Sequence, residues 1–258
     1  MSTTIVGGGN MGEALLTGLG SDVTVVEQSP SRASYLESRY NVKVASMESA
    51  IASADTVFVV VKPYHFAALL DSLAPHVRPG QLIVSAVGGT PTAAIESHLP
   101  GAPAVVRSMP NLPVSVGLGT IAISGGAHAV AADLERVRTM LAPVGRVIEV
   151  AETQLDAVTA LSGGGPAYFA LLAEAMIDAG VLAGLPRPLA EDLVLTTAEG
   201  TGRMLGAPDA DPAGLRAAVC SPGGTTIAAM RELEGRALRA AVMAAVVAAR
   251  DRSIEMGR

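Results

Sequence analysis

Two glycine-rich stretches hold the residues best suited to chemistry. In the first, residues 5–19, Gly7, Gly9 and Gly12 have the spacing G-x-G-x-x-G, after a β-branched run and before a helical stretch. Gly7 suits a tight turn, Gly9 lets the backbone approach a pyrophosphate, and Gly12 lets helix pack on strand. The helix that starts at Asn10 and Met11 would turn its free N–H groups toward the phosphates. This stretch predicts a site for a dinucleotide.

An acidic residue follows at the distance expected for ribose recognition. Glu27 ends the second β-branched run, twenty residues after Gly7, where a carboxylate would bind the ribose 2′-OH of NADH. Ser29 and Arg32 follow it and could instead receive the 2′-phosphate of NADPH. Glu27 would repel that phosphate, which biases the site toward NADH, but both cofactors stay open. The acid also argues against a glycine-rich turn that binds nothing.

Two further loops at predicted strand ends could contact the same cofactor. Lys62 and Pro63 follow one strand in VVVKPYHF, and Asn111 follows another in RSMPN. Open α/β sheets bind ligands at the carboxyl ends of their strands. We therefore assign Lys62, Pro63 and Asn111 to the cofactor site, with purely local hydrogen bonds in the loops as the alternative.

The second glycine-rich stretch, CSPGGTTIAAM, interrupts a region of helical spacing. Consecutive glycines let backbone N–H groups converge on an anion, and flanking hydroxyl groups add donors that a plain turn would not need. We expect Gly224 to adopt backbone angles that a β-branched residue resists. The stretch predicts a carboxylate site made of Ser221, Gly223, Gly224, Thr225 and Thr226.

The elements that must position these loops change type near residue 152. Before it, short β-branched runs alternate with helical stretches, which is typical of βαβ units around a mostly parallel sheet. We expect a Rossmann-type α/β dinucleotide-binding domain over residues 1–152. Its predicted strands are residues 3–6, 22–27, 42–45, 55–61, 81–87, 103–108, 119–124 and 146–150.

Residues 153–258 are expected to form an all-α C-terminal domain, because apolar residues recur there at helical spacing. We predict helix breaks at residues 163–166, 185–188, 207–212 and 221–224. The Ala-rich stretch ALRAAVMAAVVAAR is too apolar to leave exposed, so we expect this domain to form the interface of a homodimer.

Composition excludes several classes of protein. With 258 residues, 50% hydrophobic and 16% charged, the chain predicts a globular protein. A net charge of −6 argues against nucleic acid as a partner. The apolar run 240–249 is half the length of a membrane span, and the N-terminus lacks the basic segment of a signal peptide. One cysteine fits a reducing cytoplasm, and the four histidines have no metal-ligand spacing. We expect a soluble, cytoplasmic protein that binds neither membrane nor metal.

Six motifs, in this order, together resemble those of the Δ1-pyrroline-5-carboxylate reductase family: GGGNMG, VKP, RSMPN, LDAVTALSGGGPAYF, EAMIDAGVLAGLP and CSPGGTTIAAMRELE. The resemblance covers nearly the whole chain. It implies hydride transfer from NADPH or NADH to the C=N bond of a small cyclic imine, giving L-proline. It also implies interlocked dimers built by the helical domain and larger rings such as a decamer.

In the same resemblance the Ser-Pro-Gly-Gly-x-Thr loop holds the substrate carboxylate, and we assign Thr226 as the catalytic group, near the ring nitrogen. Three residues depart from the family pattern: Gly88, Leu112 and Gly164. They leave open a reductase of a related imine, such as a methylated pyrroline or a piperideine.

Two other functions share parts of this pattern. A hydroxyacid dehydrogenase of similar layout uses a lysine in its helical domain, but no lysine follows Lys62 here. A non-catalytic NAD(P)-binding sensor would keep the first glycine motif without needing SPGGTT. Turnover of the cofactor with the cyclic imine would separate the sensor from the enzyme.

Overall fold

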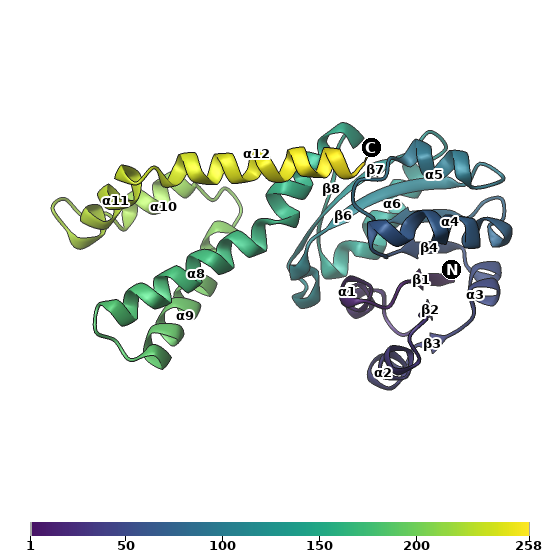
Figure 1. Ribbon diagram of the computed structural model, residues 1–258, viewed down its shortest axis with the longest axis horizontal. Coiled ribbons are helices and arrows are strands. Elements are labelled where there is room, and N and C mark those ends of the chain that lie inside the picture. Colours follow the sequence, from purple (N-terminus) through teal and green to yellow (C-terminus); the bar gives the residue numbers. More distant parts are fainter. Residues whose placement is uncertain (1, 258) are drawn as a thin grey trace. The chain divides into compact units, whose positions relative to one another are not determined.

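The computed structural model describes residues 2–257, which form two compact units. The first unit holds residues 2–164 and 247–257, and the second holds residues 165–246. Figure 1 shows the sheet of the first unit with helices around it, and the long helices of the second.

Eight strands form one sheet in the order β3-β2-β1-β4-β5-β6-β7-β8, with every neighbouring pair parallel except β6 and β7. The doubly wound sheet predicted from the sequence is confirmed, and each predicted strand is present. The strands are β1 Thr3–Val6, β2 Val23–Val26, β3 Lys43–Val44, β4 Thr56–Val59, β5 Leu82–Ser85, β6 Ala104–Pro110, β7 Gly119–Gly125 and β8 Gly145–Glu149.

Helices cover both faces of this sheet. Successive side chains of a buried strand point to opposite faces, so apolar side chains on each face need helices to bury them. Ile5 packs with one core cluster, which draws on α1, α2 and α6, and Val6 packs with the other, which draws on α3, α4 and α5. The strand order reverses at β1, so a crevice is expected beside its carboxyl end. The helices of this unit are α1 Asn10–Leu19, α2 Pro30–Tyr40, α3 Met47–Ser53, α4 Phe66–Leu73, α5 Thr92–His98, α6 Ala131–Leu141 and α7 Leu155–Val158.

The second unit is entirely helical, as predicted. Three of the four predicted breaks separate its helices, whereas at 163–166 the chain runs from a π-helical turn, Thr159–Gly163, directly into α8. Helices α8 and α9 pack side by side. The helices are α8 Gly165–Leu182, α9 Arg187–Leu205, α10 Pro212–Ala218, α11 Thr225–Gly235 and α12 Leu238–Met256, and the last turns of α12 belong to the first unit.

These units divide the chain later than the boundary expected at residues 152 and 153. The reason is that α7 and the π-helical turn pack onto the sheet: Ala160 is buried, and Asn111 donates its side-chain N–H to the Ser162 carbonyl at 3.1 Å. The end of α12 joins them, since the buried Ser253 donates its hydroxyl to Asp156 at 2.7 Å.

The helical unit leaves most of its apolar surface uncovered. Of residues 165–246, only Gly165, Ile177 and Ala190 are buried, while side chains such as Phe169 and Met243 are more than 60% exposed. Over residues 2–257, one stretch, 152–182, is long and apolar enough to cross a membrane by length and composition alone. Exposed apolar surface of this extent is typical of an interface with another protein chain.

Candidate active site

The first glycine-rich stretch forms the turn from β1 into α1. Gly7 has a φ of +107° and donates its N–H to the Val26 carbonyl at 2.9 Å. A Cβ at Gly7 would collide with the carbonyl oxygen of Val60, and a Cβ at Gly12 would collide with that of Gly7. The turn and the close packing of α1 therefore require glycine at both positions.

Gly9 leaves the start of α1 open. It precedes the first helical residues, Asn10 and Met11, and its N-cap position offers no side chain to bond the free N–H groups of the first turn. Gly9 is exposed, and a Cβ there would meet none of the described atoms within 4 Å. Uncapped N–H groups facing open space are the arrangement that binds a pyrophosphate.

Glu27 lies beside this loop at the end of β2. Its Oε2 accepts the N–H of Gly8 at 3.0 Å, and its Oε1 accepts the N–H of Ser29 at 2.8 Å. Ser29 caps α2 by accepting the N–H of Arg32 at 3.5 Å, and its hydroxyl lies 3.1 Å from that of Ser31. The predicted acid is therefore next to the glycine loop, whereas the Ser29 hydroxyl already has local partners.

Arg32 also contacts the glycine loop, in a way the sequence did not predict. Its Nε donates to the Gly8 carbonyl at 2.7 Å, and its Nη2 is hydrogen-bonded and ion-paired with Glu13. The guanidinium carbon lies 5.0 Å from the centre of the Tyr35 ring. Sequence reasoning missed Glu13, because only the packing of α1 beside α2 brings it to Arg32.

A cavity of about 380 Å³ adjoins Gly7 and Glu27 at the carboxyl ends of β1, β2 and β4. Its volume lies in the range of small-molecule sites. Sequence reasoning missed the rest of its wall, which comes from residues far apart in the chain, among them Met47, Val61, His65 and Leu69.

The structure places the other predicted cofactor residues at two different strand ends. Lys62 is exposed and Pro63 begins the short 3-10 turn Pro63–His65 that follows β4. Asn111 is buried after β6, where its Oδ1 accepts the Thr120 N–H at 2.8 Å in addition to the bond to Ser162. The partners of Asn111 are thus 9 and 51 residues away, and its assignment to the cofactor site stays a prediction.

The second glycine-rich stretch connects α10 to α11. Gly224 donates its N–H to the Ser221 carbonyl at 3.0 Å, and Thr225 and Thr226 open α11 with no side-chain cap before them. The left-handed residue is Gly223, with a φ of +69°, whereas Gly224 has an extended φ of −79°. The expectation of unusual angles at Gly224 is wrong, and a Cβ there would instead push against the Ser221 hydroxyl.

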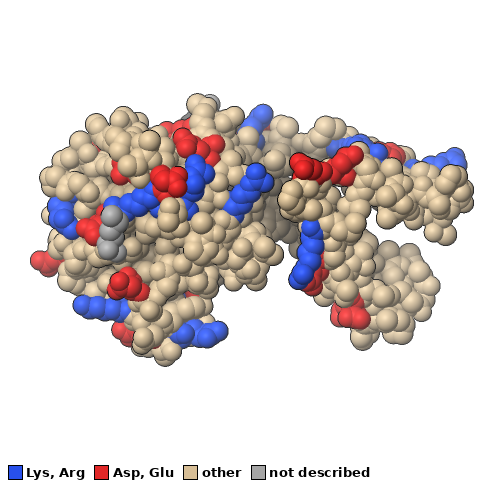
Figure 2. All heavy atoms as spheres, turned by 180° about the vertical axis from the view of Figure 1, so that it is seen from behind, with Lys and Arg blue, Asp and Glu red and all other residues tan. Residues whose placement is uncertain are grey.

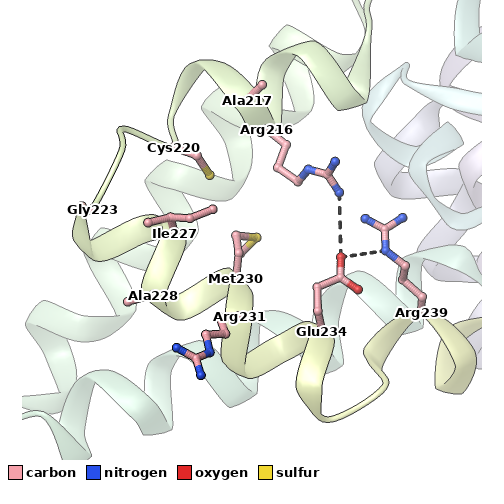
Figure 3. Close-up of a pocket in the computed structure, with 11 residues that line it drawn as sticks. Arg216, Ala217, Cys220, Gly223, Ile227, Ala228, Met230, Arg231, Glu234 and Arg239 are labelled. Atoms are coloured by element: carbon pink, nitrogen blue, oxygen red, sulfur yellow. Dashed lines mark hydrogen bonds and ion pairs between the residues drawn. The ribbon is translucent and has the colours of Figure 1, made fainter.

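A cavity of about 750 Å³ lies beside this loop within the helical unit (Figure 3). Glu234 accepts from Arg239 Nε at 2.7 Å and lies 3.9 Å from Arg216 Nη1, while Arg231 points away from this group in Figure 3. Three arginines and one glutamate give the lining a net positive charge, which suits an anionic ligand. Within residues 2–257, no three His, Cys, Asp or Glu side chains gather to hold a metal ion.

Known proteins match both halves of the chain. A family model described as pyrroline-5-carboxylate reductase dimerisation matches residues 152–256, and one described as NADP oxidoreductase, coenzyme F420-dependent, matches residues 2–89. A pyrroline-5-carboxylate reductase of Mycobacterium tuberculosis is 43% identical over 98% of this chain and 95% of its own. The chain belongs to the pyrroline-5-carboxylate reductase family. It therefore has an oxidoreductase's dinucleotide-binding domain and a dimerisation domain.

Solved structures of this family have the same fold. The reductase from Coxiella burnetii has a TM-score of 0.92 and 31% identity, over 100% of this chain and 98% of that one. The Plasmodium falciparum pyrroline carboxylate reductase, solved with NADP bound, has a TM-score of 0.89 and 29% identity over the same shares. The resemblance inferred from the six motifs is confirmed.

Proposed function

We propose that this enzyme reduces the C=N bond of Δ1-pyrroline-5-carboxylate to L-proline, using hydride from NADH or NADPH. The observation that carries the proposal is 43% sequence identity, over nearly the full length, to a named reductase. The chain also has an open glycine loop and a Ser-Pro-Gly-Gly loop, each at a helix N-terminus. We place the reaction in the cytoplasm, as the last step of proline biosynthesis.

The described residues fit a nicotinamide dinucleotide. The open N-terminus of α1 suits its pyrophosphate, Glu27 suits a ribose hydroxyl, and the adjoining cavity suits the adenosine portion. Lys62, Pro63 and Asn111 complete the proposed cofactor site. When bound, the reduced cofactor supplies the hydride.

The loop before α11 is proposed to hold the substrate. Its uncapped N–H groups and the Ser221 hydroxyl bind the carboxylate, and Thr226 bonds the ring nitrogen. A protonated cyclic imine is already electrophilic, so orientation and exclusion of water supply most of the catalysis. No metal is required, and solvent is the proton source.

An NAD(P)H oxidation assay with pyrroline-5-carboxylate, run beside its six-membered piperideine analogue, tests this function. We expect turnover with the five-membered imine at the higher kcat/KM. Higher kcat/KM with the piperideine would shift the assignment to a related imine, and binding of cofactor without turnover of either would favour the sensor.

Glu27 is expected to set part of the cofactor preference. Glu27→Ser removes a hydrogen bond to the ribose and a repulsion against a 2′-phosphate, so the NADPH to NADH ratio of kcat/KM should rise about tenfold. Steady-state kinetics with each cofactor measures this ratio. An unchanged or lower ratio would mean that Ser29 and Arg32 decide the preference instead.

The helical domain, residues 153–258, is proposed to make a homodimer, which can assemble into a larger ring such as a decamer. The apolar side chains of residues 165–246 support this, since burial against a second copy removes them from water. The same burial accounts for the apolar stretch 152–182 without a membrane. On the face in Figure 2, acidic and basic residues are interspersed, which supports the proposal that nucleic acid is not a partner.

Light scattering at micromolar concentration should therefore give at least twice the 26.0 kDa of one chain. Met243→Asp, in α12, should shift the protein toward monomer by placing a charge in the interface. Leu118→Asp is the matched control, because Leu118 is a similarly exposed apolar residue of the first unit. A stable, active wild-type monomer would contradict the proposal.

A further inference from the structure

The Arg32 guanidinium belongs to a hydrogen-bonded network that links α1, α2 and the glycine loop. Glu13, in the first turn of α1, pairs with Arg32 through Oε2. Its Oε1 accepts the hydroxyl groups of Tyr35 at 3.0 Å and Tyr40 at 2.8 Å. Arg32 in turn holds the Gly8 carbonyl at 2.7 Å. The network joins the loop expected to bind the pyrophosphate to the helix that follows Glu27.

The electrostatics of the network favour a charged Glu13. Burial alone would raise the pKa of its carboxyl, but hydrogen bonds from Tyr40, Arg32 and Tyr35, with the attraction of the Arg32 charge, outweigh it and lower the pKa. The hydrogen bond to this carboxylate also raises the pKa of Tyr40. Glu13 is therefore ionised at neutral pH and neutralises the charge of Arg32.

This pairing bears on which cofactor the site prefers. Arg32 lies in the first turn of α2, soon after the end of β2, where a cation would receive a 2′-phosphate. Here a carbonyl and a carboxylate accept hydrogen bonds from its Nε and Nη2, Glu13 balances its charge, and its side chain is only 27% exposed. A 2′-phosphate could bind only the N–H groups of Arg32 that these two partners leave free, and the Glu13 carboxylate would repel it. Glu27 already bonds the N–H groups of Gly8 and Ser29 and adds a negative charge nearby.

We infer that Glu13 is a specificity-determining residue, which by pairing with Arg32 weakens the attraction of Arg32 for a 2′-phosphate and so favours NADH over NADPH. The inference rests on the proposed function only in that the site binds a nicotinamide dinucleotide. Glu13 acts through Arg32 and is thus a positioning residue.

The test is a fluorescence titration of the full protein with NADH and NADPH at several salt concentrations. Glu13→Gln keeps the shape of the side chain and removes its charge. NADPH should then bind roughly tenfold more tightly relative to NADH. The salt dependence of NADPH binding should also steepen, because Arg32 becomes available to the phosphate. Glu37→Gln, on the exposed face of α2, is the matched control for net charge and should leave the ratio unchanged.

Arg32→Gln is a second variant for the same titration, and its result does not depend on whether the Glu13 variant folds. If Arg32 is engaged by Glu13, its loss should leave the NADPH to NADH affinity ratio unchanged, even if both affinities fall. Selective loss of NADPH binding in Arg32→Gln, or an unchanged ratio in Glu13→Gln, would overturn the inference. So would an equal change in the ratio in Glu37→Gln. Wild-type protein that binds neither nucleotide would overturn the proposed function as well.

Discussion

Gly9→Ala is expected to weaken NADH and NADPH binding on the order of a hundredfold while the protein keeps its fold. The φ of Gly9 is −67°, which any residue adopts, and an added Cβ would meet none of the described atoms within 4 Å. The unliganded protein therefore tolerates the methyl group. The bound pyrophosphate would not, because the methyl group occupies the space through which the phosphate approaches the backbone. Titration of nicotinamide fluorescence gives both affinities, and circular dichroism reports the fold.

Two further glycines make this experiment decisive. Gly200→Ala, in α9, also adds a methyl group that meets none of the described atoms, and it should leave binding unchanged. Gly12→Ala should lose both binding and stability, since its Cβ would collide with the Gly7 backbone. Wild-type affinity in Gly9→Ala would mean that the cofactor does not lie on this loop.

Thr226→Ala is expected to lower kcat/KM for the imine ten- to a hundredfold, with nucleotide affinity unchanged. A hydrogen bond to a charged group is worth about 1.5–3 kcal/mol, and this change removes the one proposed for the ring nitrogen. Gly224→Val should be worse, because its side chain would displace the Ser221 hydroxyl and fill the carboxylate position. Thr197→Ala, an exposed threonine of α9, is the control.

Steady-state kinetics and cofactor titration together identify the outcome. The expected pattern is lost imine turnover with retained nucleotide binding in both loop variants. If both variants instead reduce the imine at wild-type rates, the loop is only a turn and the substrate binds elsewhere.

The sheet was predictable because its signals are local. Each strand is a short β-branched run, and the positions of Gly7, Gly9 and Gly12 follow from one turn between a strand and a helix. The glycine contacts agree with the roles given to Gly7 and Gly12, since both meet backbone atoms that leave no room for a side chain.

The remaining features depend on contacts between distant segments, which local patterns do not encode. Glu13 pairs with Arg32 only because α1 packs beside α2. The guanidinium that we predicted from the sequence to receive a 2′-phosphate therefore has a carboxylate partner. The end of α12 joins the first unit through Ser253 and Asp156, which are 97 residues apart. Which glycine of SPGGTT takes the left-handed conformation depends on where α11 begins.

Transfer of deuterium from labelled cofactor to product tests the central claim most directly. Incubating the enzyme with pyrroline-5-carboxylate and NADH carrying two deuterium atoms at nicotinamide C4 should give L-proline with one deuterium. Mass spectrometry and NMR should locate it on the ring carbon that formed the C=N bond. Oxidation of the cofactor without deuterated proline, or no oxidation beyond the rate without enzyme, would contradict the account.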